Sequence, residues 1–439
     1  MTFLASIARR NSDPSQSGTK LHFRSSGFYT DRVIFFQLSK RHSKIKMTKK
    51  LRLGILFGGR SGEHEVSLLS AASILKAIDR HKFDVVPIGI DKSGHWLTSG
   101  AAERLLTGGI APEESAAAAQ ASTSLAPSGV AALDSHAALG SQSLDVVFPV
   151  LHGTFGEDGT IQGLFELAGI AYVGSGVLGS SAGMDKDVMK RLFAQARLPI
   201  VPHVTLLRTA WESAPKKSVA MIEAALNYPV FVKPANLGSS VGISKAHDRK
   251  ELGPALDLAA KYDRKLVVEQ GVGGKVRRDG ASQVSSAGKA GNAGSAAKAR
   301  ELEVAVLGND DPKASVVGEI IPGKEFYDYE AKYLSDGSVP VIPAKLTRAE
   351  AKQVREMALA AFRACDLSGL ARVDFLMEPD GKRRIYLNEV NTMPGFTRIS
   401  MYPKLWEASG LPYTELITRL IELALERQEE KMQTSYTRD

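Results

Sequence analysis

The sequence contains almost no cysteine and no long apolar run. Cys365 is the only cysteine in 439 residues, which excludes an intramolecular disulfide framework and a zinc site built from several cysteines. Apolar stretches such as 33–36 and 146–150 fall far short of the ~18 residues that a membrane-spanning helix needs. These absences predict a chain without a membrane span, and they favour a cytoplasmic location.

Excess charge is also missing outside the first 46 residues. Residues 1–46 hold nine Lys or Arg and two Asp, and they account for most of the net charge of +8. The remainder is nearly neutral, so we expect no nucleic-acid-binding face. The basic segment is either a transit-type leader, rich in Ser and Arg and poor in acids, or an upstream extension of a chain that starts at Met47. We favour the second interpretation because Met47 directly precedes the first predicted strand.

Strand and helix patterns alternate after Met47. Residues 51–57 are typical of a buried strand, and a helix is predicted from about Glu63. Further strands are predicted at 85–90 and 145–150. This order predicts a parallel sheet with a ligand site at the carboxyl ends of its strands.

Two segments have the composition of insertions. Eleven of the thirty residues 111–140 are Ala, fifteen of the 25 residues 275–299 are Ala, Gly or Ser, and neither stretch contains an aromatic residue. Such sequences bury too little apolar surface to offset the entropy of ordering. We therefore expect insertions at about 101–143 and 275–299, the second as a flexible loop between two strands.

Two glycine-rich loops follow predicted strands. Residues 58–62 and 152–159 would let the backbone approach a ligand closely, although a tight turn explains either loop equally well. Glu65 lies one turn into the first predicted helix. Its carboxylate either complements the helix dipole or meets a substrate ammonium.

A lysine-bearing strand predicts a phosphate site. The apolar segment 231–234 carries Lys233 and precedes a Gly- and Ser-rich hairpin at 238–242. A lysine at the end of a strand supplies a point charge for phosphate, and the N–H groups of such a hairpin can close over a triphosphate. The next strand ends at Glu269 and Gln270, where backbone and carboxylate would face an adenine edge.

Two carboxylates and a carboxamide lie on a predicted strand pair near the C-terminus. Arg372 and Asp374 share a face of one strand, and Glu389 and Asn391 share a face of the next, because side chains two apart on a strand point the same way. Such oxygen ligands suit Mg²⁺ carried in with phosphates, whereas zinc would need His or Cys. The turn at 394–395 directs backbone N–H groups toward the same site.

Together these motifs resemble the D-alanine–D-alanine ligases, a family of ATP-grasp enzymes. The resemblance covers about residues 50–425 apart from the two insertions. It rests on seven segments in the family's order: 65–67, 152–159, 184–186, 232–242, 327–333, 372–374 and 389–395.

The resemblance implies an α/β, ATP-grasp fold in which an N-terminal Rossmann-like parallel-sheet domain precedes two α+β domains that clasp ATP. The implied N-terminal domain spans 47–174 and contains the insertion at 101–143. A central ATP-grasp subdomain follows at 175–270. The C-terminal catalytic domain spans 271–439 and contains the insertion at 275–299.

The resemblance also implies roles for individual residues. The nucleotide contacts would be Lys186, Lys233, Ser239, Glu269, Gln270, Val272, Glu301 and Lys332. The metal ligands would be Asp374, Glu389 and Asn391. A hydrogen-bonded triad beside the first D-alanine would comprise Glu65, Ser239 and Tyr333. The oxyanion site would be Arg372 with the amide of Gly395, while His152 would lie near the first D-alanine and Ser400 would take the carboxylate of the second.

The implied reaction joins two D-alanine molecules for peptidoglycan precursor synthesis. ATP converts the first D-alanine to an acyl phosphate, the amine of the second displaces phosphate, and two Mg²⁺ (or Mn²⁺) ions neutralise charge. Residues 325–339 resemble a lid that excludes water and carries Lys332 and Tyr333 inward. The family further implies a homodimer.

Three other functions fit the sequence less well than D-alanine ligation. A related ligase that makes D-alanyl-D-lactate or D-alanyl-D-serine is disfavoured by Tyr333, because lactate-forming relatives lack a tyrosine there. A non-catalytic nucleotide-binding protein would have a broken metal set, and this set is complete. An NAD-dependent oxidoreductase would need a glycine spacing that 58–62 does not have.

Overall fold

The computed structural model describes residues 49–97, 99–107, 144–238, 240–273, 298–321, 338–379 and 383–438. All of them belong to one compact unit, Met47–Asp439. The basic segment 1–46 and most of both predicted insertions lie outside the described residues, as do Ser239 and residues 325–337 of the predicted lid. Among the described residues, no helix combines the length and the apolarity that a membrane crossing requires.

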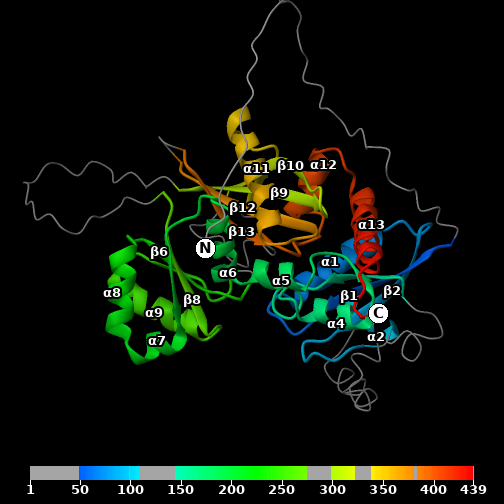
Figure 1. Ribbon diagram of the computed structural model, residues 1–439, viewed down its shortest axis with the longest axis horizontal. Helices are drawn as coiled ribbons and strands as arrows, with labels where there is room; N and C mark the ends of the chain where they lie inside the picture. Colours follow the sequence, from blue (N-terminus) through cyan, green and yellow to red (C-terminus); the bar gives the residue numbers. More distant parts are fainter. Residues whose placement is uncertain are drawn as a thin grey trace, which may run out of the picture. The chain divides into compact units, whose positions relative to one another are not determined.

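The first sheet is parallel, with the strand order β2–β1–β3–β4. Figure 1 labels β1 and β2 of this sheet. Its strands are β1 (Leu51–Gly58), β2 (Phe83–Ile90), β3 (Val146–Val150) and β4 (Ala171–Tyr172). Parallel neighbours need crossover connections, and these contain α1 (His64–Ala77), α2 (Ser99–Leu106) and α4 (Thr160–Ala168). The predicted parallel sheet is therefore confirmed, and α2 runs into the start of the predicted insertion at 101–143.

The second sheet is antiparallel and carries the lysine-bearing strand. Its order is β5–β8–β6–β7, formed by β5 (His203–Leu207), β8 (Lys265–Gln270), β6 (Val230–Pro234) and β7 (Ser244–Ala246). The predicted hairpin at 238–242 joins β6 to β7. An apolar cluster packs this sheet against α7 (Arg208–Ser213), α8 (Pro215–Ala225) and α9 (Arg249–Ala260).

The third sheet is also antiparallel and carries the predicted metal ligands. Its order is β11–β10–β9–β12–β13, with β11 (Val339–Val341), β10 (Lys313–Ile321), β9 (Arg300–Gly308), β12 (Gly369–Met377) and β13 (Ile385–Asn391). Helix α11 (Arg348–Ala364) covers it and begins with a capping box between Thr347 and Glu350. Helix α5 (Val177–Met184) approaches β13 so closely that a Cβ on Gly183 would lie 2.6 Å from the Thr392 side chain.

The proposed domain boundaries at 174 and 270 fall between the sheets, but one helix packs across them. Met189 and Phe193 of α6 (Lys186–Gln195) belong to the apolar cluster of the third sheet, although the proposed central subdomain contains this helix. The three-domain division remains a proposal, and α6 is its connecting element.

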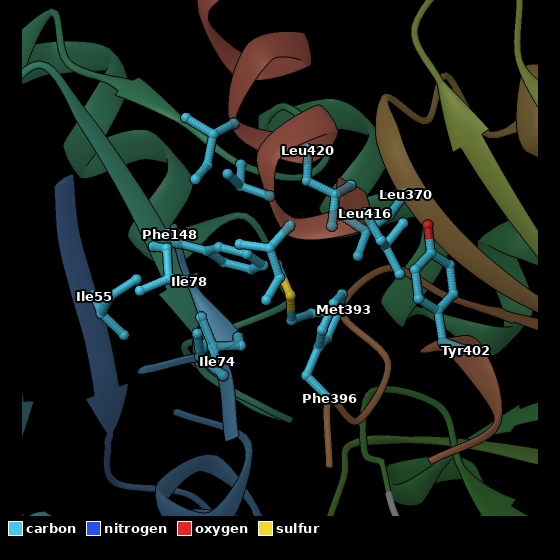
Figure 2. Close-up of a cluster of buried hydrophobic side chains, with 14 of the residues drawn as sticks. Ile55, Ile74, Ile78, Phe148, Leu370, Met393, Phe396, Tyr402, Leu416 and Leu420 are labelled. Carbon is cyan, nitrogen blue, oxygen red and sulfur yellow. The ribbon is translucent and has the colours of Figure 1, made fainter. Parts of the chain in front are cut away.

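The largest apolar cluster joins the first sheet to the C-terminal helices α12 (Met401–Ala408) and α13 (Tyr413–Lys431). Figure 2 shows Phe148 of the first sheet, Leu370 of β12 and Leu416 of α13 around the Met393 side chain. The Phe148 and Phe396 rings meet edge to face with centroids 5.5 Å apart. This shared core fixes the segment 393–396 between the first sheet and the C-terminal helices.

Leu420→Ala should lower the free energy of unfolding by about 2–5 kcal/mol, the usual cost of a cavity at a buried leucine. Leu420 lies on the inner face of α13 and is fully buried. The matched control is Leu167→Ala on α4, where 88% of the residue is exposed, and its effect should stay within about 0.5 kcal/mol. Urea unfolding of both variants measures the difference, and equal losses would contradict the packing described here.

Candidate active site

Two neighbouring clefts contain most of the predicted site residues. The first cleft is lined by Glu63, His152, Glu157, Lys186, Asn391 and Gly395, among others. The second cleft is lined by Lys233, Glu269, Gln270, Val272, Glu301 and Asp374, among others. Four residues line both clefts: Ser240, Ile243, Arg372 and Glu389. Ligands in the two clefts would therefore meet beside Arg372 and Glu389.

The pairing of β12 with β13 builds this junction. Arg372 stands opposite Asn391, and Asp374 stands opposite Glu389, so the predicted strand pair is confirmed. The Arg372 guanidinium donates to both oxygens of Asp374, at 2.8 and 2.7 Å, and lies 3.2 Å from the Glu303 carboxylate. Two acids thus hold the guanidinium in one orientation.

The predicted metal ligands lie together at the junction. Asn391 Nδ2 donates to Asp374 Oδ2 at 2.9 Å, and Glu389 lines both clefts. In the described parts of the chain, no three His, Cys, Asp or Glu side chains form a metal-binding group. Two carboxylates and a carboxamide nevertheless fit Mg²⁺, which is usually held by one or two carboxylates together with substrate phosphates.

Lys186 and Lys233 reach the junction from different elements. Lys186 starts α6, donates to the Leu237 carbonyl at 2.7 Å and lies 4.0 Å from Glu389. Lys233 belongs to β6, and its Nζ donates to Glu269 Oε2 at 2.8 Å. Burial opposes the charge on Lys233, but the carboxylates of Glu269 and Glu389 outweigh it and raise the pKa of this lysine. Both lysines therefore stand beside the metal ligands, as the sequence predicts for phosphate contacts.

The predicted adenosine contacts line the second cleft, with one correction. Gln270, Val272 and Glu301 all lie there, although the Gln270 side chain accepts from the Asn227 backbone N–H at 3.1 Å. The Glu269 carboxylate was expected at an adenine edge. The structure turns it inward instead, where it is buried between the ammonium groups of Lys190 and Lys233.

Glu65 is not brought to either cleft. Its side chain is 54% exposed and forms an ion pair with Lys92, so of its two predicted roles the structure supports the helix-start carboxylate. Glu63, two residues earlier, is 7% exposed and lines the first cleft. A Cβ at Gly153 or Gly238 would lie 2.6 Å from Glu63 Oε2, so this carboxylate fits between the loop at 152–159 and the start of the hairpin at 238–242. The N-terminal start of α1 at His64 makes Glu63 the capping position and turns it toward the strand ends.

His152 lines the first cleft, and both of its ring nitrogens bind the protein. Its expected place beside the first D-alanine stays a prediction. Nδ1 lies 2.9 Å from the Met393 carbonyl, and Nε2 lies 3.1 Å from Ser70 Oγ. Because a carbonyl only accepts, Nδ1 carries the hydrogen and Nε2 accepts from the Ser70 hydroxyl. Burial lowers the pKa of His152 to about 4. The ring is therefore a neutral bridge to the Gly395 segment.

Three further contacts hold the segment that contains Gly395. The Met393 amide donates to Glu157 Oε2 at 3.0 Å, and the Phe396 amide donates to Ser70 Oγ at 3.1 Å. The Phe396 carbonyl accepts from the Tyr413 hydroxyl at 2.5 Å. Burial raises the pKa of Glu157 to about 7, although the N–H groups of Gly153 and Met393, the Thr392 hydroxyl and the nearby Arg372 oppose the shift. Ser70 and Glu157 were not predicted, because their partners lie 326 and 236 residues away.

The remaining predicted residues are not part of the described clefts. Ser400 precedes α12, and its hydroxyl lies 2.8 Å from that of Thr397. It does not line either of the two clefts as the described residues form them. Ser239, Lys332 and Tyr333 lie outside the described residues. Their predicted roles stay predictions.

Comparisons with known proteins define the class of this fold. A D-alanine–D-alanine ligase from Coxiella burnetii has a similar structure, with a TM-score of 0.67, 34% identity, and 87% of this chain and 96% of that chain covered. The VanG D-Ala:D-Ser ligase from Enterococcus faecalis is also similar, with a TM-score of 0.68, 34% identity and 86% and 100% of the two chains covered. The predicted ATP-grasp α/β architecture is confirmed by these neighbours.

Sequence comparisons identify the family within this class. The model of the D-ala D-ala ligase N-terminus matches residues 52–175, and the model of the C-terminus matches 192–282 and 294–422. Relatives named D-alanine–D-alanine ligase include those of Natranaerobius thermophilus, 49% identical over 88% of this chain and 98% of that protein, and Geobacillus thermodenitrificans, 47% identical over 88% and 99%. The chain belongs to the D-alanine–D-alanine ligase family.

Proposed function

We propose that this chain joins two D-alanine molecules at the expense of ATP, as a D-alanine–D-alanine ligase of peptidoglycan precursor synthesis. The observation that carries the proposal is the junction of the two clefts at Arg372 and Glu389. An amino-acid substrate in the first cleft would present its carboxylate to a nucleotide phosphate from the second. A cytoplasmic homodimer completes the proposal, since the family implies it.

The first step activates a carboxylate. The carboxylate oxygen of one D-alanine attacks the γ-phosphorus of ATP, the bond to the β-phosphate oxygen breaks, and D-alanyl phosphate and ADP form. The ammonium groups of Lys186 and Lys233, at the edge of the junction, would hold the phosphates in line for this transfer. Gln270, Val272 and Glu301 would contact the adenosine at the other end of the second cleft.

Glu63 would orient the first D-alanine. Its carboxylate faces the first cleft between Gly153 and Gly238 and would accept from the substrate ammonium. We assign to Glu63 the role that the sequence assigned to Glu65, while Ser239 and Tyr333 keep their proposed places in the same triad. This arrangement would keep the substrate carboxylate directed at Arg372 and the phosphate.

Asp374, Glu389 and Asn391 would hold two Mg²⁺ (or Mn²⁺) ions with the nucleotide phosphates, and the ions would neutralise charge on the transferring group. Contacts within the protein hold these side chains in place. The Arg372 guanidinium donates to both oxygens of Asp374, and the Asn391 side-chain amide donates to Asp374 Oδ2. The ligands come from two paired strands, so the strand pairing fixes their spacing.

The second step forms the peptide bond. The amine of the second D-alanine attacks the acyl carbon, phosphate leaves, and the amine loses a proton. Arg372 and the Gly395 amide would stabilise the oxyanion that develops on the carbonyl. The contacts of His152, Ser70 and Glu157 along 393–396 would fix that amide in advance. Residues 325–339, with Lys332 and Tyr333, would exclude water, and Ser400 would bind the carboxylate of the second D-alanine.

A second acceptor is worth testing because VanG, named a D-Ala:D-Ser ligase, resembles this chain as closely in structure as the Coxiella enzyme does. The curated relatives at 47–49% identity are instead named for D-alanine. Sequence identity therefore favours D-alanine as the second substrate as well.

The wild-type enzyme should release phosphate from ATP with D-alanine in a Mg²⁺-dependent reaction and form D-alanyl-D-alanine. The measurement is coupled phosphate release together with mass spectrometry of products, using D-alanine alone and D-alanine with D-serine or D-lactate; L-alanine is the control. Dipeptide should exceed the mixed products at neutral pH. Turnover with L-alanine at an equal rate, or a predominant D-seryl product, would overturn the assignment.

Glu63→Gln should raise the KM for D-alanine by roughly 10-fold or more, because a hydrogen bond to a charged group is worth about 1.5–3 kcal/mol. The KM for ATP should change little. Glu65→Gln is a matched control two residues away, and its kinetics should equal those of the wild type. The reverse pattern would return the role to Glu65.

A further inference from the structure

A buried lysine below the junction has no role in the reaction described so far. The Lys190 side chain is fully buried on α6. Its Nζ lies 3.1 Å from Glu269 Oε1 and donates to the Asn388 carbonyl at 3.3 Å. A buried ammonium is costly unless it is paired, so these two contacts account for its presence.

Lys190 shares one carboxylate with Lys233. Lys190 Nζ lies 3.1 Å from Glu269 Oε1, and Lys233 Nζ lies 2.8 Å from Glu269 Oε2. Although burial opposes ionisation, the two lysines together lower the pKa of Glu269 to about 2. Burial lowers the pKa of Lys190 although the Glu269 carboxylate opposes this, whereas the carboxylates around Lys233 raise the pKa of that lysine.

The shared carboxylate matters when Lys233 changes partners. A nucleotide phosphate in the second cleft would draw the Lys233 ammonium away from Glu269. Without another cation, this movement would leave a buried carboxylate unpaired, which is strongly unfavourable. Lys190 would remain 3.1 Å from Glu269 Oε1 in either state, and it would thereby make the exchange possible.

The contact with Asn388 ties the same lysine to the metal-ligand strand. The register of β12 and β13 shifts between Asp374 and Phe375, so that Asp374 pairs with Glu389 and Phe375 pairs with Leu387. Asn388 is the extra residue of this bulge, and bulges often aim side chains at active sites. Lys190 thus connects Glu269 of the second sheet with the residue next to Glu389 of the third.

We propose that Lys190 is a positioning residue for nucleotide binding: it holds the Glu269 carboxylate permanently and thereby leaves the Lys233 ammonium free to exchange onto phosphate. The proposal rests on the function proposed above, because it assumes that ATP occupies the second cleft. Lys190 itself does not touch the nucleotide. Its effect is transmitted through Glu269 and Lys233.

The test compares nucleotide affinities by titration calorimetry with ADP in EDTA and with ATP and Mg²⁺. Lys190→Met should weaken the binding of both nucleotides at least about 10-fold, with the KM for D-alanine unchanged. Adding Glu269→Gln to this variant removes the carboxylate that would be left unpaired. The double variant should therefore bind nucleotide within about 3-fold of the wild type.

Lys265→Met is the control for loss of a poorly exposed ion-paired lysine in the same region. Lys265 lies 2.6 Å from Asp185 and 3.3 Å from Asp187 and lines neither described cleft. Its loss should lower the melting temperature but leave ADP affinity within about 3-fold of the wild type. A loss of ADP affinity as large as that of Lys190→Met would overturn the specific role of Lys190.

The outcomes separate this proposal from the proposed function. Wild-type protein that neither binds ATP nor makes dipeptide contradicts the function itself. Wild-type activity together with unchanged nucleotide affinity in Lys190→Met overturns only the role of Lys190. If Lys190→Met does not fold, the double variant decides the matter: near-normal ADP affinity supports charge sharing, and lost affinity in a folded double variant overturns it.

Discussion

The register of one antiparallel strand pair is the constraint on which this site depends. Arg372 and Asp374 of β12 face Asn391 and Glu389 of β13, so four functional groups project from one face of two adjoining strands. A shift of either strand by one residue would turn its two functional groups to the opposite face and separate them from the other two. The apolar partners on the other face, including Val373, Phe375 and Val390, are buried against α6 and α11. Burial of these alternate residues is what fixes the polar ones at the junction of the clefts.

The other half of the site depends on contacts between distant parts of the chain. The segment that contains Gly395 is held from the N-terminal side by Ser70, His152 and Glu157, and from α13 by Tyr413. These polar groups are buried, and a buried polar group without a partner is costly. Each contact therefore favours a single position of the Gly395 amide. The same core places Met393 and Phe396 among apolar side chains of the first sheet and α13 (Figure 2).

The sequence was sufficient where the information is local. The parallel sheet, the lysine strand with its hairpin and the paired strands with the metal ligands follow from periodicity of two and from turn residues, and the structure confirms them. Glu65 was predicted beside the substrate, but the structure leaves its side chain half exposed and paired with Lys92, while Glu63 lines the first cleft. Which of the two reaches the cleft depends on where α1 begins, and helix ends are uncertain by one or two residues. In this helix the Glu63 side chain at the cap lines the first cleft, whereas Glu65 in the first turn projects to solvent.

Pairs far apart in the sequence explain what local patterns could not predict about two other residues. Glu269 lines the second cleft, but strand position alone cannot reveal its pairing with Lys190, which lies 79 residues earlier. His152 lines the first cleft, but its partners, 82 and 241 residues away, leave no local signal. Such contacts exist only once three sheets have packed, and no pattern in one segment predicts them.

The central claim is that a carboxylate in the first cleft receives the γ-phosphoryl group of ATP across the junction. Single-turnover reaction with D-alanine labelled by ¹⁸O in its carboxylate tests it directly. Phosphoryl transfer to the carboxylate, followed by attack of the amine, leaves one carboxylate oxygen on the released phosphate. The account predicts inorganic phosphate that carries one ¹⁸O atom for each dipeptide formed. Unlabelled phosphate released together with dipeptide would contradict it.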